Sequence, residues 1–114
     1  MMEAEKLAQL IAKTLIDKKG MDVLIIDIAL KSGFADYFVM ASAGSERHLE
    51  ALKDAVEDAL EPLEIFPKRV EGKKPSGWIL MDYGDVVVNI MDIDMREKYN
   101  LEKIWGDCEI VKIS

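Results

Sequence analysis

Two carboxylates in the last third of the chain have the spacing of a metal site. Asp92 and Asp94 are separated by one residue and follow a run of β-branched residues. Side chains that alternate at the end of a strand would place both carboxylates on one side, as a magnesium pair requires. The chemistry would be metal-dependent nucleotidyl transfer. A third ligand could come from four other aspartates, which are Asp27, Asp36, Asp82 and Asp85.

Other features weigh against this enzyme. A nucleotidyltransferase places a Gly-Ser element shortly before its Asp-x-Asp pair, whereas Ser76-Gly77 has the reverse order and a predicted hairpin intervenes. Basic residues that would hold the phosphates are missing, and carboxylates near strand ends are more often solvated turn residues. We therefore keep an enzyme that uses Asp92 and Asp94 as the alternative hypothesis. The favoured interpretation has no catalytic residue, no cofactor and no metal ligand.

Two further residue types with chemical potential occur once each. His48 is the only histidine, so a histidine metal cluster cannot form, and a Ser-His-Asp triad could use no other histidine. It is expected in the first turn of a helix. Cys108 is the only cysteine, which excludes an internal disulfide and fits a reducing compartment. No histidine lies near it in sequence to activate a nucleophile.

The charge balance indicates the kind of partner. The chain has 114 residues, half of them apolar, and a net charge of -7. This composition predicts one globular domain, 1–114. Nucleic-acid binders use a surplus of Lys and Arg, which this chain lacks. An acidic surface suits a basic protein partner, although the charge could also serve solubility alone.

The sequence predicts a cytoplasmic protein. Its longest apolar runs have the length of strands, so no segment is expected to span a membrane. The first residues are acidic, and they resemble neither a signal peptide nor an Arg-rich transit peptide.

The hydrophobic pattern predicts an α/β fold with a mixed β-sheet flanked by helices. Helices are expected over residues 3–18 and from an N-cap at Ser45 to a stop near Pro62, with an apolar stripe from Leu49 to Leu63. Short helical turns are expected over residues 95–105. Strands are expected over residues 23–28, 37–41, 65–70 (an edge strand), 78–81, 86–91 and 110–113.

The strands 78–81 and 86–91 form a predicted hairpin with two different faces. If Tyr83 and Gly84 are the loop residues, one face is apolar and should pack against helices. The other face mixes an indole with aliphatic, amide and carboxylate groups, as recognition surfaces do. It comprises Trp78, Leu80, Asp82, Asp85, Val87 and Asn89. In the alternative interpretation, a loop covers Trp78 and the carboxylates only cap the turn.

Several motifs resemble the ribosomal silencing factor (Iojap) family. The run from Gly77 to Val88, GWILMDYGDVVV, follows Glu71-Gly72 as in that family's signature. Arg96, Tyr99, Leu101-Glu102 and Trp105 are similar to its RxxYxLExLW element. Residues 35–40, ADYFVM, resemble an upstream strand, and Ser45, Arg47 and His48 resemble the start of its long helix. One departure stands out, because Asn89 takes the place of a common histidine.

The resemblance implies both a fold and a function. The fold would be similar to the nucleotidyltransferase fold without its active site. The protein would bind the large ribosomal subunit through large-subunit ribosomal protein fourteen and block association with the small subunit, which represses translation. Some family members form homodimers. The basic residues Lys68, Arg69, Lys73 and Lys74 could add a minor ribosomal RNA contact, although a solvated loop is the favoured interpretation.

These inferences define a predicted partner-binding surface. Trp78 and Leu80 would supply apolar burial, with Tyr83 nearby at the turn. Asp82 and Asp85 would meet basic groups of the partner. The remaining members would complete or brace the surface, and they are Val87, Asn89, Arg96 and Tyr99.

Overall fold

The computed structural model describes residues 3–29, 33, 35–72, 76–100, 103 and 108–112. Three α-helices, one 3-10 helix and six strands lie in these segments. The helices are α1 (Ala4–Asp17), α2 (Glu46–Leu60), η1 (Glu61–Leu63) and α3 (Ile93–Lys98). The strands are β1 (Met21–Asp27), β2 (Tyr37–Ala43), β3 (Arg69–Glu71), β4 (Trp78–Asp82), β5 (Val86–Asp92) and β6 (Glu109–Lys112).

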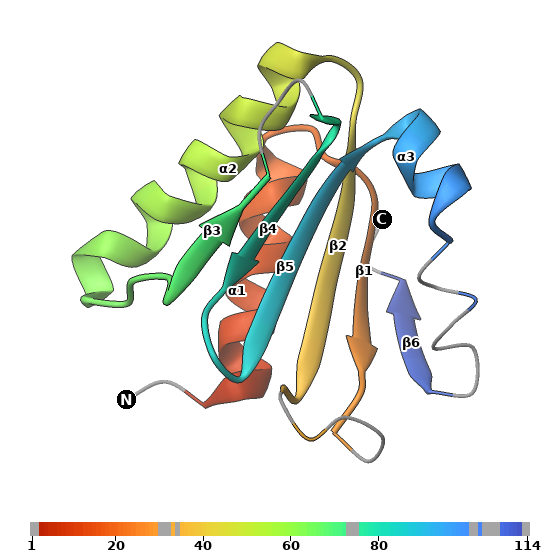
Figure 1. Ribbon diagram of the computed structural model, residues 1–114. Coiled ribbons are helices and arrows are strands. Elements are labelled where there is room, and N and C mark those ends of the chain that lie inside the picture. Colours follow the sequence, from red (N-terminus) through yellow and green to blue (C-terminus); the bar gives the residue numbers. More distant parts are fainter. Residues whose placement is uncertain are drawn as a thin grey trace.

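The strands form one mixed sheet, which confirms the predicted α/β class. Their order is β3-β4-β5-β2-β1-β6, so β3 and β6 lie at its two ends (Figure 1). β2 and β5 run parallel in the centre, whereas every other neighbouring pair is antiparallel. The central parallel pair is possible because α2 and the hairpin strand β4 connect its two strands.

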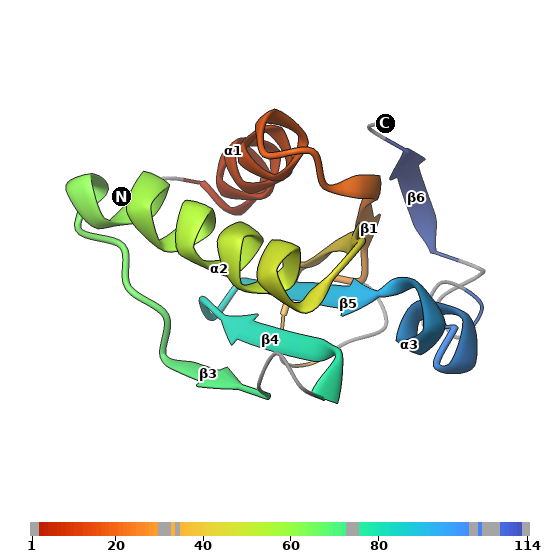
Figure 2. The ribbon, with the colours of Figure 1, turned by 90° about the horizontal axis from the view of Figure 1, so that it is seen from above.

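Helices α1 and α2 cover the same face of the sheet (Figure 2). The predicted periodicity explains this arrangement, since both helices turn an apolar stripe toward the strands. The predicted cap of α2 is confirmed, because the Ser45 hydroxyl accepts a 3.0 Å hydrogen bond from the backbone N–H of His48. The main core between helices and sheet includes the predicted apolar face of the hairpin, formed by Ile79, Met81, Val86, Val88 and Ile90.

The opposite face of the sheet, the open face, carries a second and smaller core. Ile26 from β1, Phe38 and Met40 from β2, and Val87 and Met91 from β5 are buried there. Residues from β4 and α3 pack against this cluster at one end. The open face is therefore partly a core and only partly a surface.

Some predicted boundaries were wrong. Residues 65–68 are not strand, since β3 begins only at Arg69, although its edge position is confirmed. Glu64 has a left-handed backbone (φ 59°) and Pro67 has no N–H, which delays strand pairing. The helix ends near Pro62 as expected, but Leu63 is exposed and not core.

The C-terminal motif is described in part. Helix α3 ends at Lys98, within the helical turns that were expected. Leu101, Glu102 and Trp105 lie outside the described residues, as do Lys73 and Lys74. Among the described segments, none of the helices is long and apolar enough to cross a membrane.

Candidate functional site

The hairpin between β4 and β5 has a different register from the predicted one. Asp82 pairs with Val87, Leu80 with Asn89, and Trp78 with Met91. The prediction paired each β4 residue with a residue two positions earlier in β5. Since side chains alternate with a period of two, the shift by two residues keeps every β4 and β5 side chain on its predicted face. Only Asp85 is lost from the hairpin face, because it falls in the turn.

Burial divides the predicted partner-binding surface into distinct parts. Trp78, Leu80 and Asp82 are half-buried, as a surface with an apolar anchor requires. Val87 and Asn89 are buried in the sheet, so their side chains cannot contact a partner in this conformation. The expectation that both residues are presented was wrong, because Phe38 and Met40 of β2 lie beside them in the sheet and the Trp78 indole contacts Asn89.

The aromatic residues of the two motifs come together on the open face. The ring centroids of Trp78 and Tyr99 are 5.4 Å apart, with an angle of 43° between the planes. Tyr99 is 43% exposed, and the Lys98 ammonium lies 5.5 Å from the centre of its ring. The indole N–H of Trp78 donates a 3.0 Å hydrogen bond to the Asn89 side-chain oxygen. Asn89 therefore fixes the indole from below, while Tyr99 packs beside it.

A shallow, largely apolar groove lies along Trp78, the residue that Tyr99 packs against. Its volume is about 350 Å³, and its walls include Trp78, Leu80 and Met95. Glu71, Gly72 and Ser76 complete its lining. We call the five residues Glu71, Trp78, Leu80, Met95 and Tyr99 the aromatic site. An aromatic anchor, two aliphatic walls and one carboxylate are a suitable set for burying a side chain of a protein partner.

Two glycines allow the close backbone contacts beside this site. Gly72 and Gly77 both have positive φ angles, 86° and 76°. A Cβ atom at Gly72 would collide with the carbonyl oxygen of Trp78, and one at Gly77 would collide with the Asp92 carboxylate. Both glycines belong to the quoted motif, which therefore contains structural positions as well as binding positions.

The carboxylates beside the site are already engaged within the protein. Asp82 accepts a 2.8 Å hydrogen bond from the backbone N–H of Gly84, so it caps the turn. The exposed Arg69 guanidinium lies 3.5 Å from Asp82 and 3.3 Å from Glu71. Asp82 therefore has the capping contact that the alternative interpretation expects of it. Arg69 neutralises part of the negative charge along β3 and β4.

Tyr83 and Asp85 lie at the other end of the hairpin from Trp78. Tyr83 is buried in the main core on the helix side, and its hydroxyl has no hydrogen-bond partner among the described residues. Burial, and then the charge of Glu57, raises the pKa of Tyr83. Asp85 is exposed, and its carbonyl accepts the backbone N–H groups of Asp36 and Tyr37. Neither residue joins the aromatic site, because the turn carries them toward α1.

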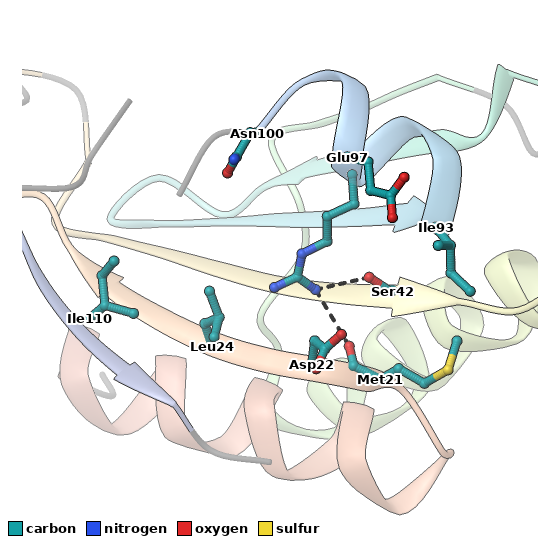
Figure 3. Close-up of a pocket in the computed structure, with 9 residues that line it drawn as sticks. Met21, Asp22, Leu24, Ser42, Ile93, Glu97, Asn100 and Ile110 are labelled. Carbon is teal, nitrogen blue, oxygen red and sulfur yellow. Dashed lines mark hydrogen bonds between the residues drawn. The ribbon is translucent and has the colours of Figure 1, made fainter. Parts of the chain in front are cut away.

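Arg96 holds α3 against the sheet on the side of the helix that faces away from the groove beside Trp78. Its guanidinium donates a 3.0 Å hydrogen bond to the Ser42 hydroxyl and one of 3.4 Å to the carbonyl of Met21 (Figure 3). The side chain is buried and lines a cavity of about 570 Å³. These hydrogen bonds attach α3, which carries Met95, to β1 and β2, and Arg96 itself does not line the groove beside Trp78.

The proposed metal pair does not have the geometry expected of it. Asp92 is the last residue of β5 and caps α3, accepting a 2.7 Å hydrogen bond from the Met95 N–H. Asp94 already belongs to the first turn of α3, so the strand alternation does not extend to it. The described part of the chain contains no group of three or more residues that could hold a metal ion.

The single histidine has a structural place at the start of α2, as expected. Its Nδ1 accepts a 3.0 Å hydrogen bond from the Gly44 N–H, and its Nε2 lies 3.0 Å from the carbonyl oxygen of Lys18. The proton must therefore be on Nε2. His48 joins the end of α1 to the start of α2.

Sequence reasoning missed Met95 and Glu71 as members of the site. The N-cap at Asp92 begins α3 directly after β5, which turns Met95 back toward Trp78. The cap signal could have been found in the sequence Asp92-Ile93-Asp94-Met95, where it was interpreted as a metal pair. Glu71 reaches the site because it pairs with Leu80. Predicting this would have required the register between β3 and β4.

Comparison with known proteins gives a consistent family. The sequence profile described as "Ribosomal silencing factor during starvation" matches residues 1–114. A protein of Halalkalibacterium halodurans named ribosomal silencing factor RsfS is 35% identical over 112 residues, covering 98% of this chain and 96% of that protein. A mouse protein named mitochondrial assembly of ribosomal large subunit protein 1 is 29% identical over 99 residues, covering 84% of this chain and 43% of that protein.

A solved structure shows the same architecture. The crystal structure of a protein from Chromobacterium violaceum superimposes with a TM-score of 0.88 at 28% sequence identity. The match covers 99% of this chain and 94% of the other. The helices, the mixed sheet and the hairpin are thus shared over nearly the full length.

Proposed function

Because the chain belongs to the ribosomal silencing factor family, we propose that it represses translation by binding the large ribosomal subunit and blocking association with the small subunit. The contact would be made with ribosomal protein fourteen of the large subunit, in the cytoplasm. The mechanism needs occupancy of the intersubunit face and no chemical step.

The aromatic pair of Trp78 and Tyr99 carries this proposal. Tyr99 leaves 43% of its surface exposed beside an apolar groove, on the face of the sheet opposite α1 and α2. Anchors of this type dominate the binding energy of protein interfaces. The net charge of -7 favours a basic partner, and ribosomal proteins are mostly basic.

The structure narrows the proposed contact set. We assign direct contact to Trp78, Leu80, Met95, Tyr99 and Glu71. Asp82 contributes charge at the edge of the site. Asn89 and Arg96 support the site from within the fold, and Val87 belongs to the second core. Tyr83 and Asp85 are left out of the contact set because they lie at the opposite end of the hairpin.

Sedimentation with purified subunits tests the function. The protein should migrate with the large subunit alone and reduce the joining of the two subunits. Tyr99→Ala should weaken binding by about 2 kcal/mol, since it removes an exposed anchor whose aromatic neighbour is Trp78. Denaturation curves should show that the variant remains folded.

A matched control is available in Phe66, another exposed aromatic residue at 60% exposure. It lines a different cavity, with Leu63 and Lys68. Phe66→Ala should leave subunit binding unchanged. Equal losses in both variants would argue against the aromatic site, and no binding by the unaltered protein to either subunit would overturn the function.

A further inference from the structure

The strand β6 is an edge of the sheet with apolar side chains on both of its faces. It pairs with β1 on one side, and no described residue pairs with its other side. Every second residue of such an edge directs its N–H and C=O away from the sheet. Ile110 is 39% exposed and Val111 is 46% exposed.

The opposite edge is protected in the ways that sheets commonly use. β3 has only three residues, and Pro67 lies just before it. Its charged residues Arg69 and Glu71 are joined by an ion pair. Short, charged edges of this kind resist the addition of another strand. β6 has four residues with Glu109 and Lys112 at its ends, and its two central residues are apolar and exposed.

Each face of β6 borders a cavity of different character. Val111 lies on the α1 side, where it lines a cavity of about 310 Å³ together with Glu5, Asp27 and Glu109. Tyr37 lies in the same cavity, and burial followed by the charges of Asp27 and Glu5 raises its pKa. This side would attract cationic side chains.

The other face borders a cavity that carries both apolar and polar groups. Ile110 lines the cavity of about 570 Å³, with Leu24 and Ile93 in its walls (Figure 3). Figure 3 shows the carboxylates of Asp22 and Glu97 at the border of this cavity. An added side chain on this face would therefore lie beside the aliphatic side chain of Ile110, and the same cavity also contains these two carboxylates and the Arg96 guanidinium.

We infer that the edge of β6 that faces away from β1, which is unpaired among the described residues, binds an extended, basic protein segment as a seventh strand. Alternation of its side chains would place long Lys or Arg side chains on the side of Glu109, Glu5 and Asp27, and apolar side chains beside Ile110. Backbone hydrogen bonds supply the alignment, and the two cavities supply the specificity. The inference is independent of the aromatic site.

A designed peptide tests this inference with the full-length protein. The probe is a short peptide in which lysine and valine alternate, and its binding is measured by fluorescence anisotropy. A peptide of the same composition with all lysines before all valines has the same charge but no alternation. The alternating peptide should bind at least about tenfold more tightly. Equal affinities would overturn the proposal, because they would show only general attraction to an acidic protein.

Two paired measurements locate the site. Glu109→Lys should weaken the binding of the alternating peptide at least about tenfold, whereas Glu61→Lys, the same charge change on exposed η1, should have little effect. Equal effects of both variants would contradict a site at β6.

Peptides methylated on alternate backbone nitrogens provide the second measurement. One methylation pattern should abolish binding and the other should not, since only alternate N–H groups face β6.

A second copy of the chain is the competing occupant. If sedimentation shows a dimer that Ile110→Lys dissociates, and the alternating peptide does not bind, the edge is used for self-association and the inference is wrong. Thermal denaturation of each variant checks that the fold is retained.

Discussion

At the scale of single residues, the departure from the family pattern at Asn89 has a defined place. The side chain is buried, its oxygen accepts the Trp78 indole N–H, and its Nδ2 has no hydrogen-bond partner among the described residues. The family's common histidine could accept the same hydrogen bond through one ring nitrogen. The substitution therefore affects how strongly the Trp78 indole is held in position. It would change partner binding only through its effect on Trp78.

Tyr83 allows a test of the free-energy cost of burying a polar group. Its hydroxyl is buried and lacks a hydrogen-bond partner among the described residues. Tyr83→Phe removes the cost of burying that group, so the free energy of unfolding should rise by up to about 1 kcal/mol at neutral pH. Urea denaturation measures this change. Tyr99→Phe, at an exposed ring, serves as the control and should have little effect.

The same variant predicts a pH dependence. Burial raises the pKa of Tyr83 in the folded protein above its ordinary value of 10.0. Unfolding then releases a proton as the pH passes 10.0, so the unaltered protein loses stability as the pH rises. Phenylalanine has no such proton. The stability advantage of Tyr83→Phe should therefore grow above that pH, and a constant difference would contradict a buried neutral phenol.

At the scale of elements, the two glycines of the motif hold β3, β4 and α3 in contact. Gly72→Ala would force a Cβ into the Trp78 carbonyl at a positive φ, and should lower the free energy of unfolding by at least about 2 kcal/mol. Urea denaturation measures the loss. Gly44→Ala is the control, because its Cβ would come no closer than 3.7 Å to Met21, and it should change stability by less than about 0.5 kcal/mol. A tolerated Gly72→Ala would show that β3 can shift without cost.

The sequence predicted elements well where the pattern was local. The stripes of α1 and α2, the Ser45 cap and both hairpin strands needed only neighbouring residues, and all were confirmed. The hairpin register needed the turn geometry, in which the Tyr83 N–H donates to the Val86 carbonyl and the two loop residues are Gly84 and Asp85. The burial of Val87 and Asn89 depended on β2, which is distant in sequence and parallel to β5. The hydrophobic pattern alone could not show that β2 lies beside β5.

At the scale of the whole molecule, net charge gives a prediction for partner binding. Attraction between an acidic chain and a basic partner is screened by salt. Binding to the large subunit should weaken at least about threefold between roughly 0.05 and 0.2 M monovalent salt at constant magnesium. Sedimentation or fluorescence anisotropy can measure this change in affinity. Glu71→Gln should reduce this salt dependence, and an affinity independent of salt would show that apolar contacts alone account for binding.

The family and the fold could both be predicted from motifs and hydrophobic periodicity. The candidate site was predicted in part, because Trp78, Leu80 and Tyr99 do meet on one face. Met95 and Glu71 were missed, since the first depends on a helix cap and the second on a strand register. Side-chain chemistry was thus easier to predict than the distant contacts that decide exposure.

The parallel pair at the centre of the sheet also constrains the order in which the protein can fold. β2 and β5 are separated by α2 and a hairpin strand, yet their side chains complete both cores. A growing chain that has released only α1, β1, β2 and α2 still has one long side of β2 unpaired. Such an intermediate exposes backbone groups and apolar side chains until β5 arrives. Release of the chain through Asp92 is therefore the point at which β2 can first gain its second neighbour, and premature termination before it would leave an aggregation-prone fragment.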